Sequence, residues 1–316
     1  MRKEFSSYIE QIAQEREDLI FITGDLGYNA LENARAKLGE RFINAGVAEQ
    51  NMVSMAAGMA FEGFQVICYS IAPFVVYRAL EQIRNDVCFH NMPVYIVGNG
   101  GGYGYGIMGS SHHAIEDIGC LSGLPNMTCY VPAFVEDLNS CLDEMFANKK
   151  PSYLRLGLGK NMGRSLSPTF YGVGSKENKD AELTIIAQGP IANNVIAAMD
   201  NNEYAGRAEL FTINKMPLKT LPDEIRDRIS RTKNVLTIEE HIAIGGLGSA
   251  VSLIINEQSL PVNKFKSLYA KGYPNNLYGS QSYHQEINGL DSQSISNEIN
   301  SFFNVSDKLR RTSGKN

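Results

Sequence analysis

The sequence predicts an α/β protein in which a doubly wound parallel-sheet domain is followed by a smaller α/β domain. Short apolar runs alternate with longer amphipathic stretches in the first half of the chain, an order typical of a parallel sheet with helices on both faces. Residues 157–180 lose this periodicity and contain many Gly, Ser, Asn and Lys residues. A second series of strand and helix patterns follows. The length of 316 residues suits two domains of ordinary size.

The predicted strands are apolar runs that end at Gly, Pro or a polar residue. In the first domain they cover residues 19–23, 65–70, 94–98, 127–131 and 152–156, with helices at 49–62, 74–90, 115–122 and 135–148. In the second domain strands are predicted at 183–187, 209–213, 235–239 and 262–269, and helices at 191–199, 223–230 and 246–257. We place the domains at residues 1–158 and 181–305, with a linker over 159–180 and a flexible tail over 306–316.

The composition excludes several classes of protein. The chain has 29 Lys and Arg against 34 Asp and Glu, so it lacks the basic excess of a nucleic-acid-binding protein. Its apolar runs are far shorter than the ~20 residues that cross a bilayer, and residues 1–14 lack the apolar core of a secretory signal. The five cysteines form no Cys-x-x-Cys pair and indicate buried reduced thiols. We therefore expect a cytoplasmic protein without membrane or nucleic-acid partners.

Two candidate acids follow predicted strands, at the sheet edge where open parallel sheets bind ligands. Asp25 comes directly after the strand at 19–23 and either caps a turn or contacts a ligand. Glu49 opens a helix rich in Ala, Met and Gly, which is predicted to be buried. The helix dipole usually explains a lone Glu in a first turn. The burial of this helix favours instead a role in acid–base chemistry.

A third loop contains seven Gly residues between positions 98 and 109, followed by two Ser residues and by His112 and His113. It matches neither a P-loop nor a Rossmann fingerprint, and the spacing of His and Cys does not favour zinc. Adjacent histidines on a glycine-rich loop suit proton transfer to a bound substrate. They are equally consistent with capping or solvent-exposed histidines, and the spacing alone leaves both interpretations open.

These motifs, in this order, resemble the transketolase family of thiamine-diphosphate enzymes, and in particular the C-terminal subunit of a split, two-component transketolase. The matching segments are residues 23–27, 46–51, 73–87 (PFVVYRALEQIRNDV), 110–118 (SSHHAIEDI), 124–132 (LPNMTCYVP) and 239–251 (EEHIAIGGLGSAV). The resemblance implies that the first domain is a pyrimidine-binding domain and the second a transketolase C-terminal domain.

The resemblance also implies roles for individual residues. Glu49 matches the glutamate that hydrogen-bonds the aminopyrimidine ring of the cofactor and so promotes its activation. Phe74 lies in the segment that stacks on the pyrimidine, with Tyr77 as the alternative, although both also suit a simple core. Arg78 matches an arginine of the deoxyxylulose-phosphate synthases. His112 matches the histidine that handles the proton of the substrate hydroxyl.

Two further residues have implied roles near the same site. Asp25 matches an acid close to the cofactor. His113 stands where the family often has Gln, and we expect it to bind substrate.

The chain lacks the Gly-Asp-Gly sequence through which the family holds the metal ion of the cofactor diphosphate. A diphosphate needs a divalent cation and its carboxylate ligands. The resemblance therefore implies that a partner subunit holds the diphosphate together with Mg²⁺ or a similar cation. Thiamine diphosphate would be shared between the two chains of an α2β2 heterotetramer. We expect no metal ligand in this chain.

The activity implied by the resemblance is transfer of a two-carbon ketol unit from a ketose donor to an aldehyde or ketone sugar acceptor. The phosphate-binding Arg, His and Ser of the family fall on Leu158, Gly100 and a position near Asn29, so we expect substrates that differ from those of the housekeeping enzyme. Two alternatives remain. One is the β subunit of a 2-oxo-acid dehydrogenase or decarboxylase, and the other is a non-catalytic structural subunit.

Overall fold

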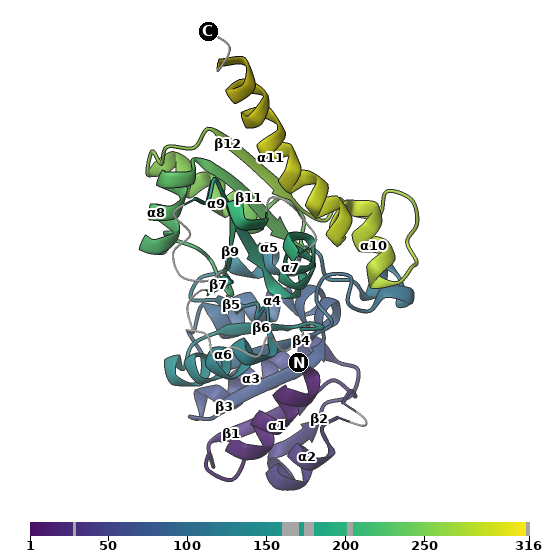
Figure 1. Cartoon of the computed structure of the whole chain (residues 1–316). Helices are drawn as coiled ribbons and strands as arrows, with labels where there is room; N and C mark the ends of the chain where they lie inside the picture. Colours follow the sequence, from purple (N-terminus) through teal and green to yellow (C-terminus); the bar gives the residue numbers. More distant parts are fainter. Residues whose placement is uncertain (28–29, 160–170, 174–179, 201–204, 314–316) are drawn as a thin grey trace.

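The computed structural model describes residues 1–27, 30–159, 171–173, 180–200 and 205–313. The chain forms two α/β domains, the first in purple to teal and the second in green to yellow in Figure 1. Each has a mainly parallel sheet covered by helices on both faces. The predicted α/β fold class is thereby confirmed.

The sheet of the first domain has the strand order β10-β5-β6-β4-β3-β1-β2 in the part of the chain that the structure describes. Its strands are β1 (Leu19–Thr23), β2 (Phe42–Asn44), β3 (Gln65–Ile71), β4 (Val94–Asn99), β5 (Thr128–Tyr130), β6 (Ser152–Leu156) and β10 (Lys215–Met216). The pairs are parallel except that β10 runs antiparallel to β5. Because β10 lies within the sequence of the second domain but pairs with β5 of the first, it links the two domains at this edge.

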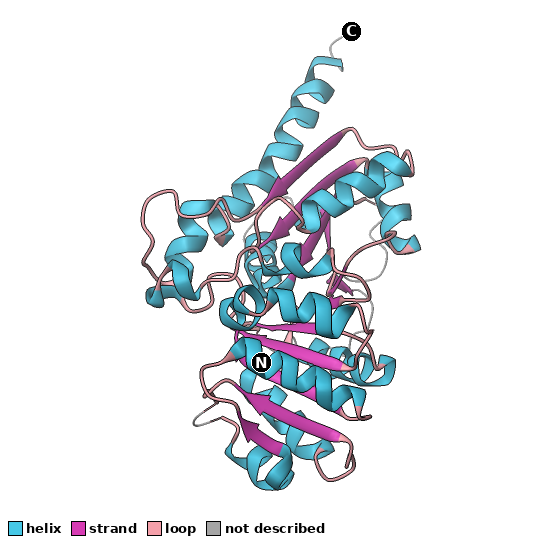
Figure 2. Cartoon of the chain, turned by 180° about the vertical axis from the view of Figure 1, so that it is seen from behind, coloured by secondary structure: helices cyan, strands magenta, loops and turns pink. Residues whose placement is uncertain are grey.

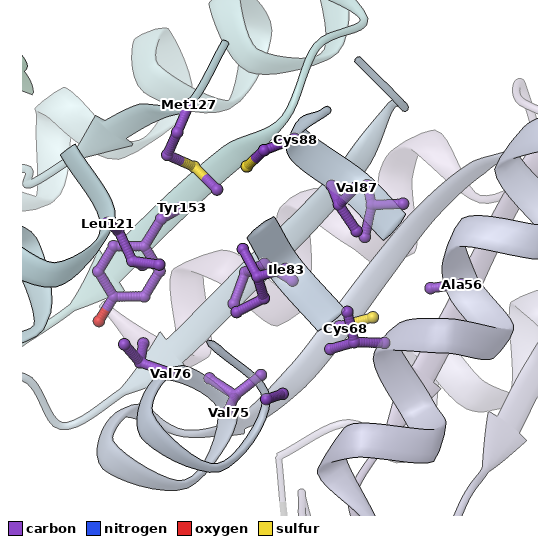
Figure 3. Packing of buried hydrophobic residues seen from close by; sticks show 14 of the residues in the cluster. Ala56, Cys68, Val75, Val76, Ile83, Val87, Cys88, Leu121, Met127 and Tyr153 are labelled. Carbon is purple, nitrogen blue, oxygen red and sulfur yellow. The ribbon is translucent and has the colours of Figure 1, made fainter. Parts of the chain in front are cut away.

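Helical segments cover both faces of this sheet, as Figure 2 shows from behind. One face carries α1 (Arg2–Ile12), α2 (Glu32–Leu38), the short η1 (Gly39–Arg41) and α6 (Val135–Asn148), and the other carries α3 (Glu49–Phe61), η2 (Phe74–Arg78), α4 (Leu80–Gln82), η3 (Ile83–Cys88) and α5 (Asp117–Ser122). Figure 3 shows the second of these cores, where Val76 and Ile83 pack with Tyr153 of β6. The continuous apolar runs of β1, β3 and β4 follow from this coverage, because both faces of each strand are buried.

The second sheet has the order β12-β11-β8-β9-β7 over its described residues. Its strands are β7 (Tyr171–Val173), β8 (Leu183–Gln188), β9 (Ala208–Thr212), β11 (Asn234–Glu239) and β12 (Lys264–Leu268). Helices α7 (Ala192–Asp200) and α11 (Ser292–Ser313) cover one face, and α8 (Asp223–Thr232) and α9 (Leu247–Glu257) the other; η6 (Gly189–Ile191) and η7 (Ala205–Arg207) are short turns. Helix α10 (Gln281–Asn288) leaves this sandwich and packs on the 3-10 turn η4 (Gly106–Met108) of the first domain.

The expected boundaries at 1–158 and 181–305 stay a prediction, but the expected linker over 159–180 contains a strand. β7 pairs antiparallel with β9 and so extends the second sheet. Residues 160–170 and 174–179 of that linker lie outside the described part of the chain.

Both ends of the chain are more helical than the sequence pattern suggested. The tail expected to be flexible from residue 306 is the end of α11, which continues to Ser313. Ile295, Ile299 and other apolar residues anchor the first turns of α11 in the core. The Lys, Leu and Arg residues that follow favour continuation of the helix.

The described residues contain no helix long and apolar enough to span a bilayer. All five cysteines are free, and four of them are buried. Burial raises the pKa of Cys68 and of Cys141, which keeps both thiols protonated and unreactive. The expectation of buried reduced thiols therefore agrees with the structure, with Cys120 as the partly exposed exception.

The winding of the first sheet reverses between β1 and β3. From β1 the chain moves outward to β2, whereas from β3 it moves the opposite way to β4. The carboxyl ends of these parallel strands meet at one edge, and doubly wound sheets bind ligands at such a reversal.

Candidate active site

Glu49 is the first residue of α3, and its carboxylate lies at the reversal point between β1 and β3. The side chain is almost fully buried. Ser70, in β3, donates its hydroxyl to Oε1 over 3.2 Å, and Arg78 Nη1 lies 3.0 Å from Oε2. A Cβ on Gly24, which follows β1, would lie 3.6 Å from Oε1. The carboxylate is therefore held by Ser70 of β3, paired with the cation of Arg78 and close to the backbone at Gly24.

Arg78 joins Glu49 to an aromatic ring. Its guanidinium carbon lies 4.1 Å from the ring centroid of Phe74, one turn earlier on η2. The Phe74 ring meets the ring of His112 edge-on, with 5.0 Å between centroids. Four of the predicted site residues thus lie together, although they come from α3, η2 and the 3-10 turn η5 (Ser110–His112).

His112 is oriented by its neighbour in the sequence. Ser111 Oγ lies 3.0 Å from its Nδ1. This contact engages Nδ1, one of the two ring nitrogens. On its other side the His112 ring lies near Tyr105, whose hydroxyl accepts a 2.8 Å hydrogen bond from the amide of Asn99 at the end of β4.

A hollow of about 530 Å³ opens in front of Glu49. It is lined by residues 47–51 and by Arg78. Val47, one of the lining residues, is 71% exposed.

The pocket residues fit the ring end of thiamine diphosphate. An aminopyrimidine needs an aromatic face to stack on and a carboxyl group that shares a proton with it in a hydrogen bond. In this structure the planar, nitrogen-rich guanidinium of Arg78 makes the same two contacts. It stacks on the ring of Phe74 and pairs with the carboxylate of Glu49. In the described part of the chain, no group of three or more His, Cys, Asp or Glu side chains is placed to hold a metal ion.

Asp25 and Tyr77 lie at the margin of this group. Asp25 adopts a left-handed conformation (φ 59°), and Asn44 Nδ2 donates to its Oδ1 over 2.9 Å. Tyr77 donates its hydroxyl to Glu116 over 2.9 Å. The other two η2 side chains of the group point elsewhere: Arg78 pairs with Glu49, and Phe74 contacts the ring of His112. Burial and the nearby carboxylates raise the pKa of Tyr77, so its phenol stays protonated. The geometry favours Phe74 over Tyr77 as the stacking residue.

His113 lies in different surroundings from His112, and its expected role in substrate binding stays a prediction. Its ring is 2% exposed, Nε2 lies 2.9 Å from the carbonyl oxygen of Gly106, and Nδ1 lies 3.1 Å from the hydroxyl of Tyr273. Both ring nitrogens are therefore engaged by the protein. His112 ends the 3-10 turn η5, whereas the backbone of His113 is extended (φ −89°, ψ 148°), and the two adjacent rings have different neighbours.

Sequence reasoning missed Ser70 and Ser111, the two hydroxyl residues that contact the predicted catalytic side chains. Ser111 sits inside the SSHH motif, but Ser70 sits inside a strand-like run and has no local signal of its own. Only the parallel pairing of β3 with β1 brings it to the start of α3.

The positions expected to lack phosphate ligands have the following surroundings. Gly100 has a positive φ of 76°, and a Cβ there would clash with the ring of Tyr105 at 2.3 Å, so a side chain is excluded. Leu158 is 71% exposed. Asn29 lies outside the described residues.

Fold and site together define a two-domain α/β chain with a buried acid at its strand reversal, and comparison with family models identifies the class. Residues 1–160 match the model for the transketolase pyrimidine binding domain, and residues 172–278 match the model for the transketolase C-terminal domain. The chain belongs to the thiamine-diphosphate-dependent transketolase family.

Individual relatives match this chain over most of their length. It is 30% identical to a subunit of the apulose-4-phosphate transketolase of Actinobacillus succinogenes, over 81% of this chain and 83% of the relative. It is 33% identical to a putative transketolase C-terminal section of Methanocaldococcus jannaschii, over 95% of both. A solved structure of a split-gene transketolase, described as an inactive β4 tetramer, matches with a TM-score of 0.78 at 29% identity and covers 95% of this chain and 97% of that one.

Proposed function

We propose that this chain is the pyrimidine-binding subunit of a split transketolase that transfers a two-carbon ketol unit from a ketose donor to an aldehyde or ketone sugar acceptor. The observation that carries the proposal is the contact series from Glu49 through Arg78 and Phe74 to His112 at the strand reversal. Two relatives support the proposal, because this chain covers 83% of one, named as a transketolase subunit, and 95% of the other, named as a transketolase C-terminal section.

Thiamine diphosphate, when bound, would supply a nucleophilic carbon for addition to the ketose carbonyl and an electron sink for breakage of the adjacent C–C bond of the substrate. Glu49 holds the pyrimidine ring by sharing a proton with it in a hydrogen bond, and the Ser70 hydroxyl keeps its carboxylate in place. Phe74 packs against one face of the ring, which requires Arg78 to leave that face. His112 takes a proton from the substrate hydroxyl and returns it at Nε2, because Ser111 engages Nδ1.

A partner subunit supplies the site for the diphosphate and its metal ion in this proposal. The chain has no Gly-Asp-Gly sequence. Apolar residues are exposed beside the pocket and on the loop of His112, with Val47 at 71%, Ile107 at 76% and Met108 at 52%. Exposed apolar groups near a site mark a protein interface, and an α2β2 heterotetramer would cover them on both copies.

The activity test uses the chain assembled with the subunit that carries the diphosphate-binding domain, with thiamine diphosphate and Mg²⁺. We expect transfer of a ketol unit from a ketose to glycolaldehyde or a longer aldose, without pyruvate decarboxylation. His112→Asn should lower kcat by about 10²-fold with a smaller change in KM, because the variant loses proton transfer.

His90→Asn is the matched control, because this histidine is exposed and does not line the pocket. Pyruvate decarboxylation in place of ketol transfer would assign the chain to the 2-oxo-acid enzymes. Full activity of the assembled His112→Asn variant would contradict the role of this residue, and an inactive wild-type assembly would favour a structural subunit.

A further inference from the structure

The glycine-rich loop that carries His112 closes on itself at its base. Gly102 N donates to Ala114 O over 2.7 Å, and Ala114 N donates back to Gly102 O over 2.9 Å. The part of the loop between these residues includes η4, η5 and the exposed Ile107. The position of His112 therefore depends on what fixes this base.

Glu240, directly after β11 of the C-terminal domain, holds the base of the loop. Its Oε1 accepts the backbone N–H of Tyr103 over 2.6 Å. Gln281 and Gln285, both on α10, donate to the same carboxylate at 3.0 and 2.5 Å. The Glu240 side chain is 7% exposed, so these bonds are made away from water, where hydrogen bonds to a charged acceptor are strong.

Two glycines allow this close approach. Gly102 has a φ of +64°, and a Cβ there would lie 2.3 Å from Glu240 Oε1. A Cβ on Gly101 would lie 2.1 Å from Nε of the buried Arg155. Gly101 and Gly102 are therefore required for the close approach of Arg155 and Glu240, and not for flexibility of the loop.

A ring cluster completes the contact between the loop and the C-terminal domain. Tyr103 is fully buried, stacks on His284 of α10 with 4.9 Å between centroids, and donates its hydroxyl to Gly272 O over 2.7 Å. His113 stacks on Tyr273 at 5.6 Å. Burial lowers the pKa of both histidines, so their neutral rings pack as aromatic groups.

We propose that the C-terminal domain acts on the reaction by clamping the glycine-rich loop, and that Glu240 is the positioning residue through which it fixes His112. The ring cluster of Tyr103, His113, Tyr273 and His284 is the second contact of this clamp. The effect on catalysis rests on the proposed role of His112. The clamp itself rests only on the contacts between the two domains.

Hydrogen exchange on the full chain tests the clamp without any activity measurement. Glu240→Ala should raise the rate of amide exchange in residues 99–113 by about tenfold or more. The loss of a hydrogen bond to a charged acceptor should increase the equilibrium constant for local opening of the loop by about a factor of ten. Exchange in α3 should stay as it is. Glu240→Gln should restore part of the protection, since its amide oxygen still accepts from Tyr103 N.

Glu239→Ala is the matched control. Glu239 is the neighbouring residue and is also buried, but it accepts the backbone N–H groups of Leu247 and Gly248 at the start of α9. Glu239→Ala should raise amide exchange in α9 and leave residues 99–113 protected. Tyr103→Phe, which removes one hydroxyl bond, is a milder second variant and should raise loop exchange by about threefold.

Steady-state kinetics of the assembled enzyme test the consequence. Glu240→Ala should lower kcat by about tenfold while the apparent Kd of thiamine diphosphate changes by less than about twofold, and Glu240→Gln should recover part of kcat. Loop exchange that is unchanged in Glu240→Ala and Tyr103→Phe overturns the clamp. A loss of kcat shared by Glu239→Ala, or matched by weaker cofactor binding, overturns the positioning role. A wild-type assembly without ketol transfer refutes the proposed function, and the exchange result still decides the clamp.

Discussion

Glu49→Gln is expected to lower ketol transfer by the assembled enzyme by about 10²–10⁴-fold, the usual contribution of acid–base catalysis. The amide has the shape of the carboxylate and can still accept the hydroxyl of Ser70, which lies 3.2 Å from Oε1. It carries no charge to pair with Arg78 and cannot exchange a proton with the pyrimidine ring. The loss should therefore appear in kcat, with a much smaller change in the affinity for thiamine diphosphate.

Glu62→Gln provides the control for this substitution. Glu62 lies at the exposed C-terminal end of the same helix α3. It should have wild-type kinetics. If Glu49→Gln kept more than about one tenth of the wild-type kcat, Glu49 would have no central part in the chemistry.

Arg155→Met is expected to reduce the free energy of unfolding by about 3–5 kcal/mol, because it leaves a buried carboxylate without its cation. Arg155 Nε lies 3.1 Å from Asp117 Oδ2, and both side chains are nearly inaccessible. The same Oδ2 accepts the hydroxyl of Tyr153 over 2.6 Å. Arg155 also donates to the carbonyl oxygens of Ala114 and Glu240, so the pair lies at the junction between the domains.

Urea unfolding followed by circular dichroism and by tyrosine fluorescence measures this loss, since the chain has 15 Tyr and no Trp. Adding Asp117→Asn to Arg155→Met should recover part of the stability by removing the unpaired charge. Arg226→Met, which breaks an exposed pair with Asp223 on α8, should cost less than about 1 kcal/mol. A similarly small loss for Arg155→Met would contradict the assigned importance of the buried pair.

The core strands were predictable from the sequence because both of their faces are buried. The runs at 19–23, 94–98 and 152–156 coincide with β1, β4 and β6 almost residue for residue. Helix α1 escaped prediction because charged residues surround its apolar positions Phe5 and Ile9, which face the core four residues apart. Its burial depends on a sheet that forms from later parts of the chain.

The site was predictable only in part, for a related reason. Glu49, Phe74 and His112 each lie in a motif that matches the family, and the fold brings them together. The contrast between His112 and His113 was not visible in the motif, because it depends on Tyr273 and His284, more than 150 positions further along the chain. Contacts with the C-terminal domain hold His113, whereas His112 lies against Phe74 of the first domain.

Calorimetric titration with thiamine diphosphate and Mg²⁺ tests the central claim most directly. That claim is that this chain holds only the ring end of the cofactor and that a partner subunit holds the charged end. We predict that the isolated chain shows no tight binding, and that the chain assembled with its partner binds the cofactor with a Kd below the micromolar range. Sub-micromolar binding by the isolated chain would contradict the claim.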